Sequence, residues 1–439
     1  MIGERTSRMR ERALRVLPGG VTAGARANRA LGRPFYVERA EGPFVYDPDG
    51  KRYVDTCTSN GAALLGHGHP AVAEAVRRAA EMGFACAYDG VAQVSLAERL
   101  VEGVPSFEMV RFTTTGTEAT FYAVRTARAY TGKTKVLKFE GHFHGYNDPL
   151  AFSMWPDPGA SGPAEGPEPQ PETDGLPPEA LREIVVAPFN DAEAFRRVLD
   201  EHGDDLAAVI LEPINYDAGA IAPDGEFLAL VREETEKRGI VLIFDEVLSG
   251  YRTGPDCAQG YLGVVPDLSV LGKAIGGGVP LSVFGGKREL MSLVAPLGRA
   301  VHTGTYNAHL VPILAAHAFL DAIAEDGFYG RLIGQHERLE GGLRRAFGEA
   351  GLPVRVQGVG ARFGMHFGSD PDEEITGWRQ AAKLDWGAMD AFCREMDRRG
   401  VYVNPAWHHG ISAMHDEETV DRVVEAAFDS AAAVVRDHR

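Results

Sequence analysis

The sequence predicts an α/β protein whose main domain holds a mostly parallel β-sheet. Short, continuous apolar runs at residues 240–244 and 268–271 have the length and composition of strands that are buried on both faces. Segments with helical periodicity, such as residues 118–129, lie between runs of this kind. Ligands gather at the carboxyl ends of strands in such sheets, so Asp245 and Glu246 are better placed for a ligand than for solvent.

Length, composition and charge restrict the classes of protein that this chain could be. It has 439 residues, of which 44% are hydrophobic and 24% charged, as in globular proteins with two or three lobes. The formal net charge of -17 argues against nucleic acid and anionic membranes as partners. The charged N-terminus lacks an apolar signal core, and no later run is long enough to span a bilayer, so we expect a cytoplasmic protein.

We expect two domains, of which the smaller is built from both ends of the chain. Residues 56–310 contain the pattern of the large α/β domain, with helices on both faces of its sheet. Residues 1–55 supply a helix at 4–16 and a small antiparallel meander between residues 35 and 54. Residues 311–439, in which helical periodicity dominates, complete a smaller α+β domain.

Two residues near the N-terminus are candidates for substrate contacts. Arg26 lies in a glycine-flanked loop, which suits a guanidinium that binds a carboxylate, although solvated loop arginines have the same pattern. Asn60 lies in a glycine-rich passage before a helix and could line a substrate pocket. His67 and His69 follow in that passage, but no third ligand lies nearby, so we expect no metal site.

A strand followed by a turn of small residues and a helix predicts a phosphate site. The strand at 110–112 runs into Thr115, Gly116 and Thr117, and the helix follows directly. Such a junction points backbone N–H groups and the helix dipole at one place, which suits an anion. A capping turn without a ligand would have the same sequence pattern.

Two further predicted strands end in residues that could take part in binding or catalysis. The strand at 136–139 precedes Phe143 and His144, and the Phe143 ring could lie against a heteroaromatic cofactor or pack in the core. The strand at 207–211 precedes Glu212 and a glycine-containing turn with Asp217. Between these strands, residues 155–178 are rich in Pro, Gly and Glu, which predicts a mobile surface loop or lid.

Lys273 and Asp245 together predict pyridoxal phosphate as the cofactor. Lys273 follows the strand at 268–271 and is surrounded by glycines, so a planar ligand can approach the backbone closely. Pyridoxal phosphate needs a lysine at its aldehyde carbon and an anion beside its ring nitrogen. Either residue alone would be interpreted as a solvated surface group.

A second turn of small residues follows the lysine region. Gly304 and Thr305 precede a helix that begins near residue 310. The hydroxyl and N–H groups of Thr305 could bind phosphate, either in the same chain or from another subunit.

The motifs in this order resemble those of the class III, fold-type I pyridoxal-phosphate aminotransferases. The chain is most similar to the glutamate-1-semialdehyde 2,1-aminomutase branch of that family, and the likeness covers nearly all of it. The motifs that carry the resemblance are Leu17-Pro18-Gly19-Gly20-Val21 with Arg26, Gly66-His67-Gly68-His69-Pro70, Thr115-Gly116-Thr117, Lys138-Phe139-Glu140-Gly141, Phe143-His144-Gly145, Glu212-Pro213, Asp245-Glu246-Val247, Gly272-Lys273-Ala274-Ile275-Gly276-Gly277-Gly278 and Gly304-Thr305.

The resemblance implies a seven-stranded, mostly parallel sheet in the large domain and a specific role for each cofactor residue. Lys273 would hold pyridoxal phosphate as a Schiff base and move the substrate proton, and Asp245 would pair with the ring nitrogen. Phe143 and Val247 would lie on the two faces of the ring. The other residues that the resemblance places around the cofactor are Thr115, Gly116, Thr117, His144, Glu212, Asp217, Gly304 and Thr305.

The resemblance also implies a homodimer whose active sites are shared between subunits. Gly116 and Thr117 would hold the phosphate from one subunit, and Thr305 would reach it from the other. Arg26 stands where this branch binds a substrate carboxylate. Asn60 and His408 occupy positions where the aminomutases have tryptophan and glutamate, so the shell around the substrate differs.

These differences favour a transaminase that uses two half-reactions, with a carboxylate-bearing amino compound as donor and a keto acid or aldehyde as acceptor. Residues 155–178 stand in place of the glycine- and serine-rich gating loop of the aminomutases, and Asp217 replaces a common asparagine. The mutase reaction needs a lid that retains its diamine intermediate. An aminomutase or amino-acid epimerase is the alternative, and a binding protein on the same fold is a third.

Overall fold

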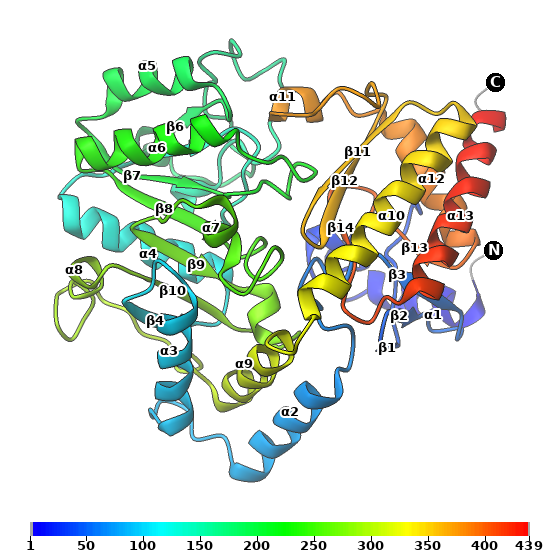
Figure 1. Cartoon of the computed structure of the whole chain (residues 1–439), viewed down its shortest axis with the longest axis horizontal. Helices are drawn as coiled ribbons and strands as arrows, with labels where there is room; N and C mark the ends of the chain where they lie inside the picture. The colour runs from blue at the N-terminus through cyan, green and yellow to red at the C-terminus, as the bar shows by residue number, and fades with distance from the viewer. Residues whose placement is uncertain (1–2, 438–439) are drawn as a thin grey trace. The chain divides into compact units, whose positions relative to one another are not determined.

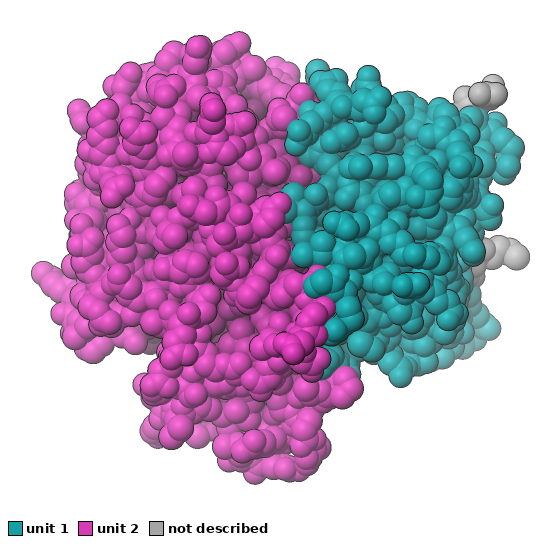
Figure 2. All heavy atoms as spheres, viewed as in Figure 1, with its two compact units in different colours: residues 1–69, 330–374, 383–439 teal, residues 70–329, 375–382 magenta. Residues whose placement is uncertain are grey.

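The computed structural model describes residues 3–437, which fall into two compact units. Unit 1 comprises Met1–His69, Gly330–Glu374 and Lys383–Arg439, as far as these residues are described. Unit 2 comprises Pro70–Tyr329 and Ile375–Ala382. Figure 1 labels the elements and Figure 2 colours the two units. Each unit is described here by itself.

Unit 2 is built around the seven-stranded, mostly parallel sheet that the sequence predicts. The strand order is β4-β10-β9-β8-β7-β5-β6. Strands β9, β8, β7, β5 and β6 run parallel, and β10 is antiparallel to both of its neighbours, β4 and β9. The strands span Met109–Thr113 (β4), Lys135–Phe139 (β5), Ile184–Ala187 (β6), Leu206–Leu211 (β7), Val241–Glu246 (β8), Leu268–Leu271 (β9) and Ser282–Gly286 (β10).

Helix α4 (Gly116–Thr131) covers the middle of this sheet. Its buried alanines, Ala119, Ala123 and Ala127, let the helix approach the strands closely. They pack in one hydrophobic cluster with residues such as Ile243 and Val270 from the central strands. Burial of both faces explains why strands β7 and β8 have no exposed residue.

Several of the remaining helices of unit 2 pack against the sheet (Figure 1). Helix α6 packs against β8, α5 against β6, and α3 against β4, while α2 packs against α9. The elements are α2 (Pro70–Met82), α3 (Val91–Gly103), α5 (Ala192–His202), α6 (Gly225–Arg238), α7 (Cys257–Leu262), α8 (Arg288–Met291), α9 (Leu310–Ile323), α11 (Trp378–Ala381) and the 3-10 helices η3 (Asp148–Leu150), η4 (Pro178–Glu183) and η5 (Lys273–Gly276).

Unit 1 is an α+β unit from both ends of the chain, as predicted. One sheet has the order β1-β2-β3-β13, in which a C-terminal strand pairs with the N-terminal meander, and a second has the order β11-β12-β14. The strands are β1 (Arg39–Glu41), β2 (Phe44–Tyr46), β3 (Arg52–Asp55), β11 (Val354–Val359), β12 (Arg362–Phe367), β13 (Val401–Tyr402) and β14 (His409–Gly410). The helices are α1 (Glu4–Leu14), η1 (Pro18–Gly20), η2 (Gly24–Arg26), α10 (Phe328–Ala350), α12 (Trp386–Arg398) and α13 (Glu417–Asp437).

The compact units do not divide the chain at the predicted domain boundaries. The predicted divisions after residues 55 and 310 come earlier than those after His69 and Tyr329. Residues 56–69 belong to unit 1 because their backbone is bonded there: Gly42 and His67 form a β-bridge, and Gly410 donates its N–H to the Thr56 carbonyl. Helix α9 belongs to unit 2 because it packs against α2 and η5.

Candidate active site

The carboxyl ends of β7, β8 and β9 bring the predicted lysine and acids to one edge of the sheet. Asp245 is paired with Val270 in the β8–β9 register, and Lys273 follows two residues after the end of β9. Glu212 directly follows β7, the other neighbour of β8. Because the three strands are parallel and adjacent, their ends lie side by side.

Asp245 is a buried carboxyl group that contacts a buried histidine. Its Oδ2 atom lies 2.8 Å from Nδ1 of His144, and Oδ1 accepts the Val247 N–H at 3.1 Å. Burial raises the pKa of Asp245 to about 7, while the Val247 N–H and the charge of Lys273 act in the opposite direction. Burial holds the pKa of His144 well below its ordinary value, so this ring is neutral.

The charge balance of this edge favours a bound cation. Glu212 accepts the Phe143 N–H on Oε1 at 2.9 Å, whereas its buried Oε2 has no hydrogen-bond partner. Burial raises the pKa of Glu212 well above its ordinary value, and the charge of Asp217 raises it further. Asp217 is also buried, and its charge raises the pKa of Asp245 as well. A protonated ring nitrogen would offset this concentration of acids.

Lys273 stands in a strained backbone position directly after β9. Its φ angle is +47°, a left-handed conformation that costs a non-glycine residue about 1–3 kcal/mol. The preceding residue must be small, because a Cβ atom on Gly272 would lie 2.9 Å from Ser282 Oγ and 3.1 Å from Val247 Cγ1. Lys273 is partly buried, and its charge lowers the pKa values of both Asp245 and Glu212. The strain therefore lies where the sequence predicts the chemistry.

The N-terminus of α4 leaves two backbone donors for an anion. Thr115 caps the helix: its hydroxyl accepts the Glu118 N–H, and Glu118 Oε2 accepts the N–H groups of Thr114 and Thr115. Gly116 and Thr117 are the next two residues, whose N–H groups have no partner within a helix. Among the described residues, no other group accepts a hydrogen bond from them, so they suit a phosphate.

Substitution of Gly116 by alanine is expected to weaken binding of pyridoxal phosphate, the ligand predicted here, by about ten-fold. A Cβ atom at this position would lie 3.0 Å from Val247 Cγ2 and 3.1 Å from Cγ1, so Val247 must move. Fluorescence titration of the cofactor-free protein measures the dissociation constant. Gly225→Ala is the matched control, because Gly225 also begins a helix and its Cβ would meet nothing within 4 Å. Equal constants for both variants would contradict the prediction.

Replacement of Asp245 by asparagine is expected to change how stability depends on pH. In the folded, cofactor-free protein the pKa of Asp245 is raised to about 7, against about 3.9 for a solvated aspartate. Between these values the folded chain holds a proton that the unfolded chain has released, so this group lowers stability as pH rises. From pH 5 to pH 8, the free energy of unfolding of Asp245→Asn should therefore rise by about 2 kcal/mol relative to that of the wild type.

Urea denaturation of the cofactor-free protein across this pH range measures that difference. Asp89→Asn is the control, because Asp89 is exposed and the substitution removes the same charge. A gain of equal size in the control would show that net charge, rather than burial of Asp245, causes the effect.

The segment with Gly304 and Thr305 lies beside the start of α4 in the same chain. The Thr114 hydroxyl is 3.4 Å from Asn307 Oδ1, and Asn307 Nδ2 is 3.3 Å from His302 Nε2. Thr305 itself is exposed and makes no hydrogen bond among residues 3–437. Its predicted phosphate contact, from the same chain or from another subunit, stays a prediction.

The three predicted substrate residues belong to unit 1, whereas the predicted cofactor residues belong to unit 2. Arg26 is exposed at the end of η2, and its guanidinium contacts the Thr22 hydroxyl. His408 is partly buried just before β14. Asn60 belongs to a left-handed turn in which Thr58, Ser59 and Asn60 all have φ near +50°. Their substrate roles stay predictions.

One buried lysine beside the site, Lys138, was given no role from the sequence. Lys138 is fully buried in β5, and its Nζ donates to the carbonyls of His142 (2.7 Å) and Phe152 (2.5 Å). Burial lowers the pKa of Lys138 to about 7. A charged residue inside an apolar strand is the signal that could have identified it. The Lys138 amine is thus the second lysine near the site whose reactivity must be distinguished from that of Lys273.

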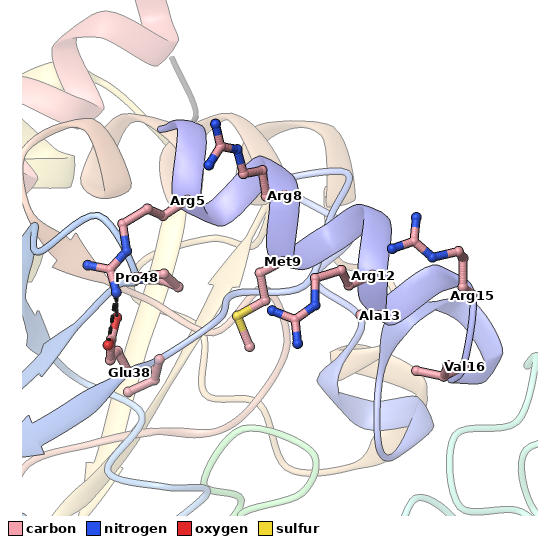
Figure 3. A pocket seen from close by; sticks show the side chains of 10 residues that line it. Arg5, Arg8, Met9, Arg12, Ala13, Arg15, Val16, Glu38 and Pro48 are labelled. Atoms are coloured by element: carbon pink, nitrogen blue, oxygen red, sulfur yellow. Dashed lines mark hydrogen bonds and ion pairs between the residues drawn. The ribbon is translucent and has the colours of Figure 1, made fainter.

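A separate groove of about 710 Å³ runs along α1 in unit 1 (Figure 3). Arginine side chains of α1 line it, and Arg5 forms an ion pair with Glu38 at 2.8 Å. None of the residues predicted to bind cofactor or substrate lines this groove. In the described part of the chain, no group of three or more His, Cys, Asp or Glu residues could hold a metal ion. Nor does any helix of that part have the length and apolarity to cross a membrane.

Comparisons with known proteins agree on one family. A family model described as Aminotransferase class-III matches residues 25–426. Glutamate-1-semialdehyde 2,1-aminomutase of Polynucleobacter asymbioticus is 38% identical over 420 residues, which cover 95% of this chain and 96% of that protein. An omega-transaminase from Sphaerobacter thermophilus superimposes with a TM-score of 0.92 and 35% identity, covering 99% of this chain and 98% of that one. A transaminase with PLP bound has a TM-score of 0.89 and 31% identity, over 100% and 99%.

Proposed function

Since the chain belongs to the class-III aminotransferase family, we propose that it is a transaminase that moves an amino group between a carboxylate-bearing amino compound and a keto acid or aldehyde. The reaction consists of two half-reactions: the donor leaves its amino group on the enzyme, and the acceptor then removes it. Small-molecule substrates follow from membership of the family.

Pyridoxal phosphate is the cofactor, and the residues of unit 2 fit it. The N–H groups of Gly116 and Thr117 suit its phosphate, and the acid cluster with Asp245 suits its protonated ring nitrogen. When bound, it supplies a ring that withdraws electrons from the substrate carbon. Cβ atoms on Gly116 and on Gly272 would each lie within 3.1 Å of a Val247 methyl group, so this apolar side chain lies beside both glycines, which supports its predicted contact with the ring.

Each residue of the proposed site has a separate role in the reaction. Lys273 is the residue whose amine would hold the cofactor and would move the proton at the substrate carbon. Asp245 holds the ring nitrogen in its protonated form, and His144 fixes the Asp245 carboxylate through the 2.8 Å contact. The Glu212 carboxyl group fixes the Phe143 backbone by accepting a hydrogen bond from the Phe143 N–H group. Arg26 binds the substrate carboxylate, with Asn60 and His408 in the surrounding shell.

The composition and the hydrogen bonds of residues 155–178 are the observation that favours a transaminase over an aminomutase. In place of a glycine- and serine-rich loop, this chain has a Pro-rich segment with a hydrogen-bonded base. The Ser153 N–H donates to the Gln170 carbonyl, and the Glu172 N–H donates to the Ala151 carbonyl. An aminomutase needs a lid that closes over its diamine intermediate, whereas a transaminase must release its first product. A segment with a fixed base favours the second.

A homodimer is part of the proposal, and exposed apolar side chains support it. Phe84 and Tyr306 are 55% and 66% exposed, and both rings pack beside His309. Gln93 Nε2 donates to the Ala308 carbonyl, which joins the 84–94 segment to the loop that contains Thr305. A second copy that covers this surface would bring its own Thr305 towards the phosphate site.

Half-reactions followed one at a time test the proposed function. The protein loaded with pyridoxal phosphate is mixed with a panel of α-, β- and ω-amino acids, and loss of the cofactor's visible band is measured. Addition of a keto acid or aldehyde should restore the band. One molecule of amino product should be released for each cofactor molecule whose absorbance is restored. No band loss with any donor would contradict the proposal.

The alternatives give different results in the same experiment. An aminomutase or epimerase would form its product without any added acceptor. A binding protein on this fold would show no exchange of amino groups, and failure of the cofactor-free protein to take up pyridoxal phosphate would favour it.

A further inference from the structure

Trp155 lies against the residue that is proposed to contact the cofactor ring. Its ring stacks on Phe143, with centroids 5.4 Å apart and planes 21° apart. Its Nε1 donates to the Asp217 carbonyl at 3.2 Å, which fixes the indole beside the acid cluster. A stacked pair joined to a buried acidic residue defines one side of the site.

Trp155 is held in place by residues on both sides of it. Its backbone N–H donates to Glu172 Oε1 at 2.7 Å, across the base of the 155–178 segment. The next carbonyl, of Pro156, accepts a 2.9 Å hydrogen bond from Trp378 Nε1. Trp378 is itself buried against Gly141, where a Cβ atom would lie 2.7 Å from the Trp378 Cβ atom. The segment's first residues therefore have little freedom to move.

Arg379, the neighbour of Trp378, holds the middle of the segment. Its Nε and Nη2 atoms bind the two oxygens of buried Glu140 at 3.0 and 3.1 Å, in a fork that fixes the guanidinium plane. The same guanidinium donates to three consecutive carbonyls of the segment, those of Ser161 (3.2 Å), Gly162 (2.9 Å) and Pro163 (3.2 Å). One side chain thus satisfies three backbone acceptors and neutralises a buried acid.

We propose that Arg379 is a positioning residue that latches the 155–178 segment, so that Trp155 forms a permanent wall behind Phe143. Both groups belong to unit 2, although Arg379 lies 239 residues from Glu140 in the chain. The sequence predicts a mobile lid at 155–178, whereas the latch makes it a fixed wall. The role of Phe143 in this inference rests on the proposed function, whereas the hydrogen bonds of Arg379 to the segment do not depend on it.

Proteolysis of the holoenzyme tests the latch without reference to activity. Glutamyl endopeptidase can cut the segment after Glu165 or Glu172, and the wild type should resist it. Arg379→Ala is expected to speed these cuts by about ten-fold or more, because charge-assisted hydrogen bonds that hold the segment closed are lost. Arg379→Lys keeps the charge beside Glu140 but not the fork, and should give an intermediate rate.

Arg238→Ala is the matched control in the same unit. Arg238 also binds carboxylates, of Asp200 and Glu234, and a backbone carbonyl, of Leu199, so its loss removes similar bonds elsewhere. This control should leave the segment resistant. Two results would overturn the latch. One is cutting of the segment in Arg238→Ala at the rate seen in Arg379→Ala. The other is cutting of Arg379→Lys elsewhere in the chain as fast as within residues 155–178.

Cofactor binding tests the wall. Trp155→Ala should raise the dissociation constant of pyridoxal phosphate by about two- to ten-fold and change its visible circular dichroism, with the segment still resistant to the protease. Arg379→Ala should produce the same spectral change together with the cuts. Cuts without any change in spectrum or affinity would overturn the positioning role, whereas absence of amino transfer in every variant would overturn only the proposed function.

Discussion

Replacement of Lys273 by alanine is expected to lower kcat by about 10⁴-fold or more, because both a nucleophile and a proton-moving group are lost. Lys273 follows β9 with a φ angle of +47°, and its charge acts on Asp245 and Glu212. The other amine near this site, Nζ of Lys138, donates to the carbonyls of His142 and Phe152, so we expect it not to substitute for Lys273. Steady-state transamination with the best donor of the panel measures the loss.

Lys273→Arg separates charge from chemistry. Arginine keeps the positive charge beside Asp245 and Glu212 but cannot lose its proton to become a nucleophile. Both variants should still take up pyridoxal phosphate, because the helix N-terminus and the acid cluster are unchanged. Turnover in Lys273→Arg within ten-fold of the wild type would contradict the assigned role.

Replacement of Asp245 by asparagine is expected to lower kcat/KM by about 10²–10³-fold, the cost of removing one preorganised electrostatic partner. An amide has nearly the same shape as the carboxyl group but no negative charge, so it cannot stabilise a protonated ring nitrogen. The Asp245 carboxyl is buried, where the surrounding medium screens its charge weakly. Steady-state rates and the pH dependence of the cofactor's absorbance measure the effect together.

His144→Asn is the comparison for this prediction. His144 contacts the Asp245 carboxyl group but does not supply the negative charge, so its loss should cost less, about ten-fold. A loss in His144→Asn as large as that in Asp245→Asn would show that orientation, rather than charge, is the main contribution of the acid.

Most of the large sheet could be predicted from the sequence, because buried parallel strands consist of continuous apolar residues. The run at 268–271 coincides with β9, and residues 240–244 overlap β8 (Val241–Glu246). Strand β10 was not identified, because Gly285 and Gly286 give it the composition of a turn. Those glycines are required by packing: a Cβ atom on Gly286 would lie 2.1 Å from the Asp267 carbonyl oxygen.

The lysine and the acids of the site could be predicted because they follow strands that share one edge. The supporting residues could not, because their partners are far apart in the chain. Arg379 lies in a segment without apolar periodicity, and neither Glu140 nor residues 161–163 gives a sign of pairing with it. Trp155 begins a Pro-rich stretch whose composition indicates mobility, although its own ring is stacked.

Reduction with borohydride followed by peptide mapping tests the central claim most directly. The protein is loaded with pyridoxal phosphate, reduced, digested and analysed by mass spectrometry. A single modified residue, Lys273, is the predicted result, with no modification in Lys273→Ala. Lys138 is the informative competitor, since burial lowers its pKa to about 7 but its Nζ donates to two backbone carbonyls. Modification of Lys138, or of no lysine, would contradict the assignment of the site.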